Sequence, residues 1–349
     1  MTDRRKILIS AAGINSGGGF VLFESLFRAL KNVPTKTHLD IRLSSRYANF
    51  VDDGLAVIVK KNFFSRVASN IRLSLEGRSQ DVLFSFNSLP PLVRSKAFTV
   101  TYIHSPQFVG LHKNSTYNFR DRLRFFVEIN WFRFFYKNSD VLWVQTESMK
   151  ALLVKQTRNV PVEVVPFIDD LLTGMHGTGT SVPDVKAVQN DEYSLFYPAA
   201  FAGHKNHICL VEAFRKLANS HPKVTLVLTL SAGDFSELVG QEPLYNVLNI
   251  GVVTREEVIA RMKASSALIF PSKAETFGIP LIEASVLGLP IIASELDFVR
   301  DVCTPVETFD PNSIDAIVDA VARFTGGNNK VKRSRLLSAD EFVLKLYQI

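Results

Sequence analysis

The chain has 349 residues, which is more than one hydrophobic core usually supports, so two domains are expected. Hydrophobic residues make up 46% of it, without repeats or low-complexity tracts, which excludes a disordered or fibrous protein. Its net charge of +6 is uneven: residues 1–170 carry 24 Lys and Arg against 14 Asp and Glu, a net of +10, and residues 171–349 carry 16 against 20, a net of −4.

Short apolar runs alternate with helical patterns through the first half of the chain. Residues 6–10 form the first predicted strand, residues 20–30 the first helix, and further strand-like runs cover residues 82–86, 98–103 and 141–145. Continuous apolar runs of this length are typical of parallel strands that are buried on both faces. Residues 1–170 are therefore predicted to form a Rossmann-like domain.

A run of three glycines, Gly17, Gly18 and Gly19, separates the first predicted strand from the first helix. Such a loop lets the backbone approach a ligand closely. A nicotinamide dinucleotide enzyme would need the spacing G-x-G-x-x-G and an acidic residue at the end of the second strand. That spacing is absent, although Asp40 could stand in for the acid. The run is thus either a ligand-binding loop or only a tight turn.

His104 directly ends the strand at residues 98–103. The position predicts a side chain at the carboxyl edge of the sheet, where α/β folds bind ligands, rather than a core histidine. The imidazole could orient a hydroxyl group by hydrogen bonding. After the next strand, Gln145 and Thr146 lead into a helix that Thr146 or Ser148 can cap, so this segment is predicted to be scaffold, peripheral to a site.

Residues 120–137 predict a helix with apolar side chains on two sides. One stripe can face the core, but the other must be shielded from water in some other way. Neighbouring elements of the fold can bury it, or it can contact an anionic membrane surface, because basic residues lie alongside. Residues 60–64, KKNFF, add a second cationic and aromatic patch. The stripes are Phe125, Ile129, Phe132 and Tyr136 on one side and Leu123, Val127 and Phe134 on the other, beside Arg122, Arg124, Arg133 and Lys137.

The second half repeats the α/β alternation after a polar stretch. Residues 171–192 are rich in Gly, Thr, Ser and Asp and are the predicted linker. Strand-like runs then predict a second Rossmann-like domain over residues 193–335. A last helix is expected at residues 339–347, within a segment of residues 336–349. The predicted strands are residues 194–197, 224–230, 247–251, 267–270 and 290–293.

The most informative segment is residues 271–294, PSKAETFGIPLIEASVLGLPIIAS, which follows an apolar strand. Pro280 is the expected first helical residue, because a missing N–H costs nothing there. The backbone amides of Phe277, Gly278 and Ile279 then lie at the positive end of a helix, a position that suits phosphate oxygens.

Two glutamates flank this turn. Glu283 lies about one turn into the helix, where its carboxylate can accept two hydrogen bonds from a vicinal diol such as a ribose, and Glu275 can reach the hydroxyls of a sugar beyond the phosphates. Either glutamate alone could instead be placed by the helix dipole. Lys205, in the segment FYPAAFAGHKNH after an earlier strand, can neutralise phosphate, although an exposed lysine is often only solvated.

The order Glu-x-Phe-Gly-x-Pro-x-x-Glu-Ala resembles the donor site of the retaining glycosyltransferases of the family 4 type, the glycosyl transferases group 1. The resemblance implies a GT-B fold of two doubly wound domains facing across a cleft, in which residues 1–170 bind the acceptor and residues 193–335 bind the nucleotide-sugar donor. It further implies that the helix within residues 336–349 packs back on the first domain. It also implies that Glu275 contacts the transferred sugar, Glu283 binds the ribose and Lys205 holds the diphosphate. The family usually has an arginine five positions before this lysine, where this chain has Ala200.

The same resemblance places the glycine run in a loop that closes over the diphosphate, and His104 near the transferred sugar and the acceptor. The implied reaction moves a hexose-type sugar from a nucleotide diphosphate donor to an acceptor hydroxyl with retention and without a metal or other cofactor. With the basic, aromatic first half, it favours a polyprenyl-diphosphate-linked acceptor in bacterial surface polysaccharide synthesis. An inactive scaffold of the same fold, and a nucleotide-sugar epimerase or phosphorylase, are the alternatives.

The expected location is cytoplasmic, with peripheral contact to the inner face of the cytoplasmic membrane. No apolar run approaches the roughly 18–20 residues that span a bilayer, and the first residues lack a cleavable signal pattern. Cys209 and Cys303 show no metal-type spacing and are expected to be reduced. Nucleic acid is not an expected partner, because no recognition-helix, zinc-finger, RNP or KH pattern occurs.

Overall fold

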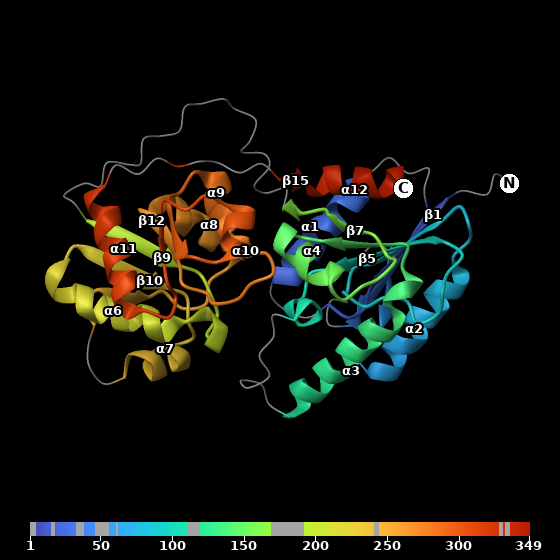
Figure 1. Cartoon of the computed structure of the whole chain (residues 1–349), viewed down its shortest axis with the longest axis horizontal. Coiled ribbons are helices and arrows are strands. Elements are labelled where there is room, and N and C mark those ends of the chain that lie inside the picture. Colours follow the sequence, from blue (N-terminus) through green and yellow to red (C-terminus); the bar gives the residue numbers. More distant parts are fainter. Residues whose placement is uncertain are drawn as a thin grey trace. The chain divides into compact units, whose positions relative to one another are not determined.

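The computed structural model describes residues 5–14, 18–32, 38–45, 56–60, 62–110, 119–168, 192–240, 244–327, 331 and 336–349. The chain divides into two compact units (Figure 1). Unit 1 comprises Met1–Asp170 and Leu336–Ile349, and unit 2 comprises Leu171–Arg335. Of the predicted linker, residues 171–191 lie outside the described residues. No helix within the described ranges combines the length and the apolar character needed to cross a bilayer.

Unit 1 contains a parallel sheet with the strand order β3-β2-β1-β4-β5-β6-β7. The order reverses between β1 and β4, which makes this position the switch point of a doubly wound fold. The strands are β1 (Lys6–Ala11), β2 (His38–Ser44), β3 (Ala56–Val59), β4 (Val82–Ser85), β5 (Phe98–Ile103), β6 (Val141–Val144) and β7 (Val162–Val164).

Helices connect these strands and cover both faces of the sheet (Figure 1). Side-chain caps fix several helix starts: Thr146 accepts a hydrogen bond from the Met149 amide at 3.2 Å, as expected for a scaffold segment. The helices are α1 (Gly18–Asn32), α2 (Phe63–Glu76), α3 (Phe119–Phe135) and α4 (Glu147–Val154), with 3₁₀ turns η2 (Pro106–Val109) and η4 (Tyr136–Asn138).

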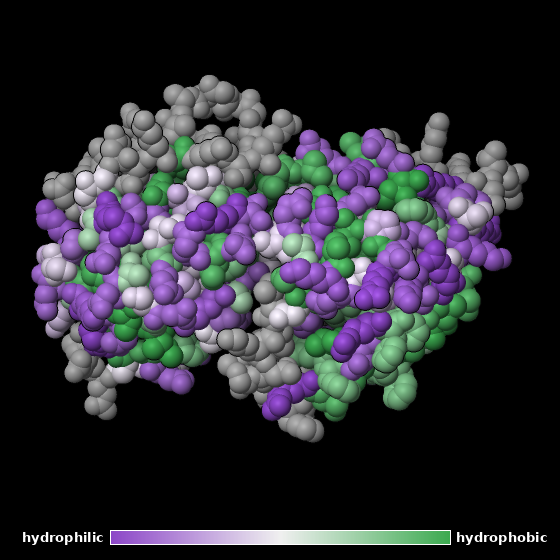
Figure 2. Space-filling model, in the orientation of Figure 1, coloured by the Kyte–Doolittle hydropathy of each residue, from purple (hydrophilic) through white to green (hydrophobic). Residues whose placement is uncertain are grey.

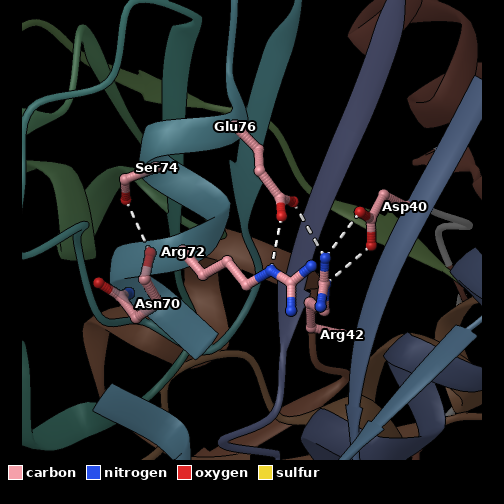
Figure 3. A network of polar contacts seen from close by, with 6 residues as sticks. All are labelled: Asp40, Arg42, Asn70, Arg72, Ser74 and Glu76. Carbon is pink, nitrogen blue, oxygen red and sulfur yellow. Dashed lines mark hydrogen bonds and ion pairs between the residues drawn. The ribbon is translucent and has the colours of Figure 1, made fainter. Parts of the chain in front are cut away.

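A charged network binds β2 to α2 (Figure 3). Both carboxylate oxygens of Asp40 accept from the Arg42 guanidinium, at 2.8 and 2.9 Å, and Arg42 also donates to Glu76 at 3.0 Å. Arg72 donates to the second oxygen of Glu76 at 2.7 Å. Asp40 is the third residue of β2, away from the carboxyl end of the strand, so it is not placed to bind a nicotinamide dinucleotide.

The end of the chain completes unit 1. β15 (Leu337–Ser338) pairs in parallel with β8 (Phe167–Ile168), and α12 (Ala339–Gln348) packs against α1. Phe342 of α12 is fully buried among aromatic rings of the unit 1 core. Its ring centroid lies 4.3 Å from that of Phe167, 5.4 Å from Trp143 and 5.5 Å from Tyr102.

Unit 2 repeats the plan with the strand order β11-β10-β9-β12-β13-β14, again parallel throughout. Its switch point lies between β9 and β12. The strands are β9 (Tyr193–Tyr197), β10 (Val224–Leu228), β11 (Val247–Asn249), β12 (Ala267–Phe270), β13 (Ile291–Ser294) and β14 (Glu307–Phe309). The helices are α6 (His207–Ser220), α7 (Ala232–Val239), α8 (Arg255–Ala264), α9 (Ile279–Leu287), α10 (Asp297–Val302) and α11 (Ile314–Gly326), with the 3₁₀ turn η6 (Gly203–Lys205).

Candidate functional site

The loops that leave β9 and β12 meet at the switch point of unit 2. Lys205 follows β9, Glu275 follows β12, and the Lys205 Nζ lies 2.5 Å from the Glu275 Oε1. Their side chains are 21% and 14% exposed, so the ion pair is largely desolvated but still reachable. The structure thus places two sequence-predicted residues together where doubly wound sheets bind ligands.

Hydrogen bonds fix the two loops to each other. Asn206 adopts a left-handed conformation (φ 61°) and donates its side-chain amide to the carbonyls of Pro271 and Pro311, at 3.2 and 2.7 Å. The Tyr197 hydroxyl bridges the Lys205 carbonyl at 2.9 Å and the Ser272 hydroxyl at 3.0 Å. The backbone on both sides of the ion pair is therefore held in place before any ligand arrives.

The N-terminus of α9 lies four residues beyond Glu275. The helix begins at Ile279, one residue earlier than predicted, because Gly278 adopts a left-handed conformation (φ 63°) as its cap. The Leu281 amide donates to the Gly278 carbonyl at 2.8 Å, so the intrahelical bonds start there. The amides at Gly278 and Ile279 precede these bonds, as is usual for a helix start that binds an anion. Phe277 is buried beneath this turn.

Glu283 lies one turn into α9 and is only 2% exposed. Its Oε1 forms an ion pair with the Arg255 guanidinium at the start of α8. A carboxylate this deeply buried needs such a partner, because an unpaired buried charge is costly. Sequence analysis did not identify Arg255, which stands 28 residues before its partner.

The position of the family's arginine is occupied by Ala200, which is exposed. His204 is also exposed, and its carbonyl accepts a hydrogen bond from the Lys273 amide at 2.8 Å. Lys205 is therefore the cation that the β9 loop brings to the carboxylate of Glu275.

The predicted residues of unit 1 lie at the carboxyl edge of its own sheet. His104 follows β5 and stacks on Phe86, with ring centroids 5.2 Å apart, and its Nδ1 lies 3.3 Å from the Ser88 hydroxyl. Burial lowers the pKa of His104 to about 4, so the ring is neutral at physiological pH.

The glycine run meets this histidine. Gly17 lies outside the described residues, whereas Gly18 and Gly19 form the first turn of α1 rather than the predicted loop. A Cβ atom on Gly19 would lie 3.1 Å from the His104 Nε2, so the glycine permits close approach of α1 to the histidine.

Among the residues that the structure describes, no group of three His, Cys, Asp or Glu side chains could hold a metal ion. Cys209 and Cys303 are both free thiols. Burial raises the pKa of the Cys303 thiol to about 12, which makes it unreactive at neutral pH.

The comparison with known protein families concerns unit 2. Residues 181–336 match the family described as Glycosyl transferases group 1. This region of the chain is similar to that family. The strand order of unit 2, the ion pair of Lys205 and Glu275, and α9 all lie inside the matched region.

Solved structures resemble the whole chain. HepE from Anabaena, in complex with UDP and glucose, is 14% identical with a TM-score of 0.63 and is matched over 99% of this chain and 95% of that one. Sucrose-phosphate synthase from Thermosynechococcus elongatus is 18% identical with a TM-score of 0.63, over 99% and 95%. The lipopolysaccharide outer core galactosyltransferase WaaB is 16% identical with a TM-score of 0.64, over 98% and 97%. The expectation of a GT-B fold is confirmed.

A curated relative adds one further match. An uncharacterized 41.2 kDa protein in the cps region of Klebsiella pneumoniae is 25% identical over 139 residues, which is 38% of this chain and 38% of the relative. The chain thus matches well under half the length of that protein.

Proposed function

We propose that this protein is a retaining glycosyltransferase that moves a hexose-type sugar from a nucleotide diphosphate sugar to an acceptor hydroxyl. The observation that carries the proposal is the ion pair of Lys205 and Glu275 at the switch point of unit 2. A cation and a carboxylate side by side, next to a helix N-terminus, match a diphosphate and the sugar attached to it. The family match of residues 181–336 supports it.

The donor is held by three parts of unit 2. The ribose diol hydrogen bonds with Glu283, the phosphates lie against Lys205 and the amides at Gly278 and Ile279, and the sugar hydroxyls donate to Glu275. Since Lys205 already contacts Glu275 without ligand, binding divides the pair: the ammonium turns to the phosphates and the carboxylate accepts from the sugar. No protein atom needs to act as nucleophile.

The charge that develops on the leaving diphosphate is stabilised by Lys205 and the α9 terminus, in place of a metal ion. The diphosphate oxygen takes the proton of the attacking hydroxyl on the same face of the sugar, which gives retention at the anomeric carbon. His104, held neutral by burial, orients a hydroxyl of the sugar or of the acceptor by hydrogen bonding.

We infer that the acceptor is a lipid-linked glycan presented at an anionic membrane. The core stripe of α3 is buried, at Phe125, Phe132 and Tyr136, but Leu123 and Phe134 on the other stripe are 54% and 75% exposed. Burial between neighbouring elements therefore does not explain the second stripe.

Exposed aromatic side chains lie at the start of α2 and along α3, and Figure 2 shows hydrophobic residues over these two helices. We call this set, Phe63, Phe64, Phe126 and Phe134, the aromatic patch. Lys60, Arg133 and Lys137 lie beside it in the sequence, a composition that suits anionic headgroups. The relative from a cps region supports a role in surface polysaccharide synthesis.

The test is a transfer assay with the purified protein, a panel of nucleotide sugars, and lipid-linked acceptors added or omitted. We expect release of the nucleoside diphosphate only when donor and acceptor are both present, and loss of most activity in Lys205→Met and Glu275→Gln. Lys216→Met is the matched control, because Lys216 forms an exposed ion pair with Asp315 in the same unit. Turnover without acceptor would identify an epimerase or phosphorylase, and full biological activity of Glu275→Ala would identify a scaffold.

Membrane contact has its own test. Flotation with vesicles that contain anionic lipid should recover the wild-type protein, and the double variant Phe64→Ser/Phe134→Ser should float poorly. Equal flotation of both proteins, or no flotation of either, would contradict the membrane proposal.

A further inference from the structure

A second group of polar side chains lies in unit 1, and none of the roles above uses it. Arg66 of α2 and Glu128 of α3 form an ion pair, with 3.7 Å between the guanidinium NH2 and the Oε1. Gln107 of η2 hydrogen bonds with the same carboxylate. We call Arg66, Gln107 and Glu128 the unit 1 polar cluster.

The unit 1 polar cluster lies at the switch point of the sheet. Gly13 follows β1 and Asn87 follows β4, the two strands where the order reverses. A Cβ atom on Gly13 would lie 2.7 Å from the Arg66 NH2 and 3.2 Å from the Asn87 Nδ2, so the Arg66 guanidinium and the Asn87 amide both lie against the turn that follows β1. Gln107 stands three residues after His104. The cluster therefore occupies the edge of the sheet at which doubly wound folds bind ligands.

The two helices hold the pair in a defined geometry. Phe63 packs edge-on against Trp131 with ring centroids 6.4 Å apart, and Arg66 contacts Glu128 one turn later along α2 and one turn earlier along α3. The side chains of Arg66 and Glu128 are 22% and 14% exposed, so a ligand can reach them while water is mostly excluded. Burial raises the pKa of Glu128, and the positive charges of Arg66 and Arg124 act against that rise.

The chemistry of the cluster matches a sugar ring. A guanidinium only donates hydrogen bonds and a carboxylate only accepts them, whereas each sugar hydroxyl does both, so adjacent hydroxyls fit a donor beside an acceptor. A phosphate fits less well, because the Glu128 carboxylate beside Arg66 repels an anion.

We infer that the unit 1 polar cluster binds the neutral, hydroxyl-rich sugar of the acceptor. This inference rests on the proposed function, in which a glycan acceptor meets the donor, and it names the residues that select that acceptor. The cluster lies one helical turn from Phe63 and Trp131, so an acceptor whose lipid end contacts the aromatic patch presents its sugar here.

The test uses saturation-transfer NMR with the full-length protein and methyl glycosides of glucose, galactose, mannose and N-acetylglucosamine. We expect at least one glycoside to bind the wild type, and its affinity to fall at least about tenfold in Glu128→Gln and in Arg66→Lys, since a hydrogen bond to a charged group contributes about that much. Glu147→Gln, which changes an exposed carboxylate on α4 in the same unit, should bind as the wild type does.

Titration with UDP, the nucleotide bound in the structurally similar HepE, and with ADP and GDP separates this inference from the proposed function. If one of these nucleotides binds the wild type and Glu128→Gln equally, while glycoside binding depends on Glu128, both stand. If none of them binds but glycoside binding still depends on Glu128, only the proposed donor site fails. If no glycoside binds, if Glu128→Gln binds as tightly as the wild type, or if inorganic phosphate displaces the glycoside, the inference is overturned.

Discussion

At the scale of single residues, the ion pair of Glu283 and Arg255 orients a buried carboxylate in the proposed donor site. The Arg255 guanidinium forms an ion pair with the Glu283 Oε1, which keeps the carboxylate of Glu283 oriented. Arg255 is thus a positioning residue in the proposed mechanism, acting on the nucleotide through Glu283.

Removal of Arg255 tests two effects of the ion pair: its contribution to the stability of unit 2 and its contribution to nucleotide binding. Arg255→Met should destabilise unit 2 by about 3 kcal/mol, because the buried Glu283 carboxylate loses the positive charge of its ion pair. It should also weaken UDP binding at least about tenfold, as loss of an oriented charged hydrogen bond does. Adding Glu283→Gln removes the buried charge, so Arg255→Met/Glu283→Gln should regain stability but not UDP affinity. Urea unfolding and UDP titration measure both, and a double variant that recovered UDP binding would contradict the proposed role of Glu283.

Buried histidines make stability depend on pH. Burial lowers the pKa of His207 to about 4 from 6.5; a hydrogen bond with the Ala199 backbone and the charge of Asp234 oppose this shift, and Lys205 and His204 add to it. Between these values the unfolded chain binds a proton that the folded chain does not, so the free energy of unfolding falls as the pH drops from 6.5 toward 4. The contribution is up to about 1.4 kcal/mol for each pH unit. Urea unfolding at pH 7 and pH 5 should show a smaller loss for unit 2 in His207→Phe, and an unchanged loss would refute the assignment.

At the scale of elements, the start of α9 depends on one backbone conformation. Gly278 has a φ of 63°, and a Cβ atom there would lie 2.9 Å from the Leu281 Cδ1. Gly278→Ala should therefore destabilise unit 2 by about 1–3 kcal/mol and weaken UDP binding, because the amides that face the phosphates must move.

Gly233→Ala is the matched control for that change. Gly233 lies within α7, nothing stands within 4 Å of its Cβ position, and the substitution should leave stability unchanged or raise it by up to about 1 kcal/mol. Thermal unfolding of the two variants compares them directly. Equal stability of Gly278→Ala and the wild type would show that α9 can begin without the left-handed turn.

Elements with continuous apolar runs could be predicted from the sequence, and those without could not. The strands at residues 98–103 and 267–270 have the predicted bounds, since ALIF is wholly apolar and FTVTYI consists of aromatic and β-branched residues, which favour strands. β2, with the sequence HLDIRLS, was not predicted because it carries an ion pair within the strand, and β7 and β14 have only three residues each.

The same contrast holds for the site. Glu275, Gly278 and Glu283 share one local motif, so their proximity follows from a strand, a turn and a helix. The ion pairs of Arg255 and Glu128 could not be predicted from the sequence, because the partner of each lies in a different helix. In the sequence, Arg255 opens a capped helix with two glutamates, TREE, and resembles an ordinary surface residue. Pairing of this kind is decided by tertiary packing, which local patterns do not contain.

At the scale of the whole molecule, the chain places its last helix in the unit that contains its first strand. Phe342 fills a space between rings from β4, β5, β6 and β8, so unit 1 is incomplete until residues 336–349 have been made. Unit 2 has its own sheet and its own buried core residues.

Phe342→Ala tests this dependence. It should destabilise unit 1 by about 3–5 kcal/mol, the usual cost of removing a buried aromatic side chain. Leu344→Ala is the control, because Leu344 lies on the same helix but is 53% exposed, and it should change stability little. Calorimetry should show a lower unfolding temperature for unit 1 in Phe342→Ala but not in Leu344→Ala.

UDP affinity of Phe342→Ala should stay at the wild-type value, because the proposed donor site lies in unit 2. Loss of UDP binding in parallel with loss of unit 1 would mean that the donor site requires both units, and the roles assigned to Lys205, Glu275 and Glu283 would then have to be shared with residues of unit 1.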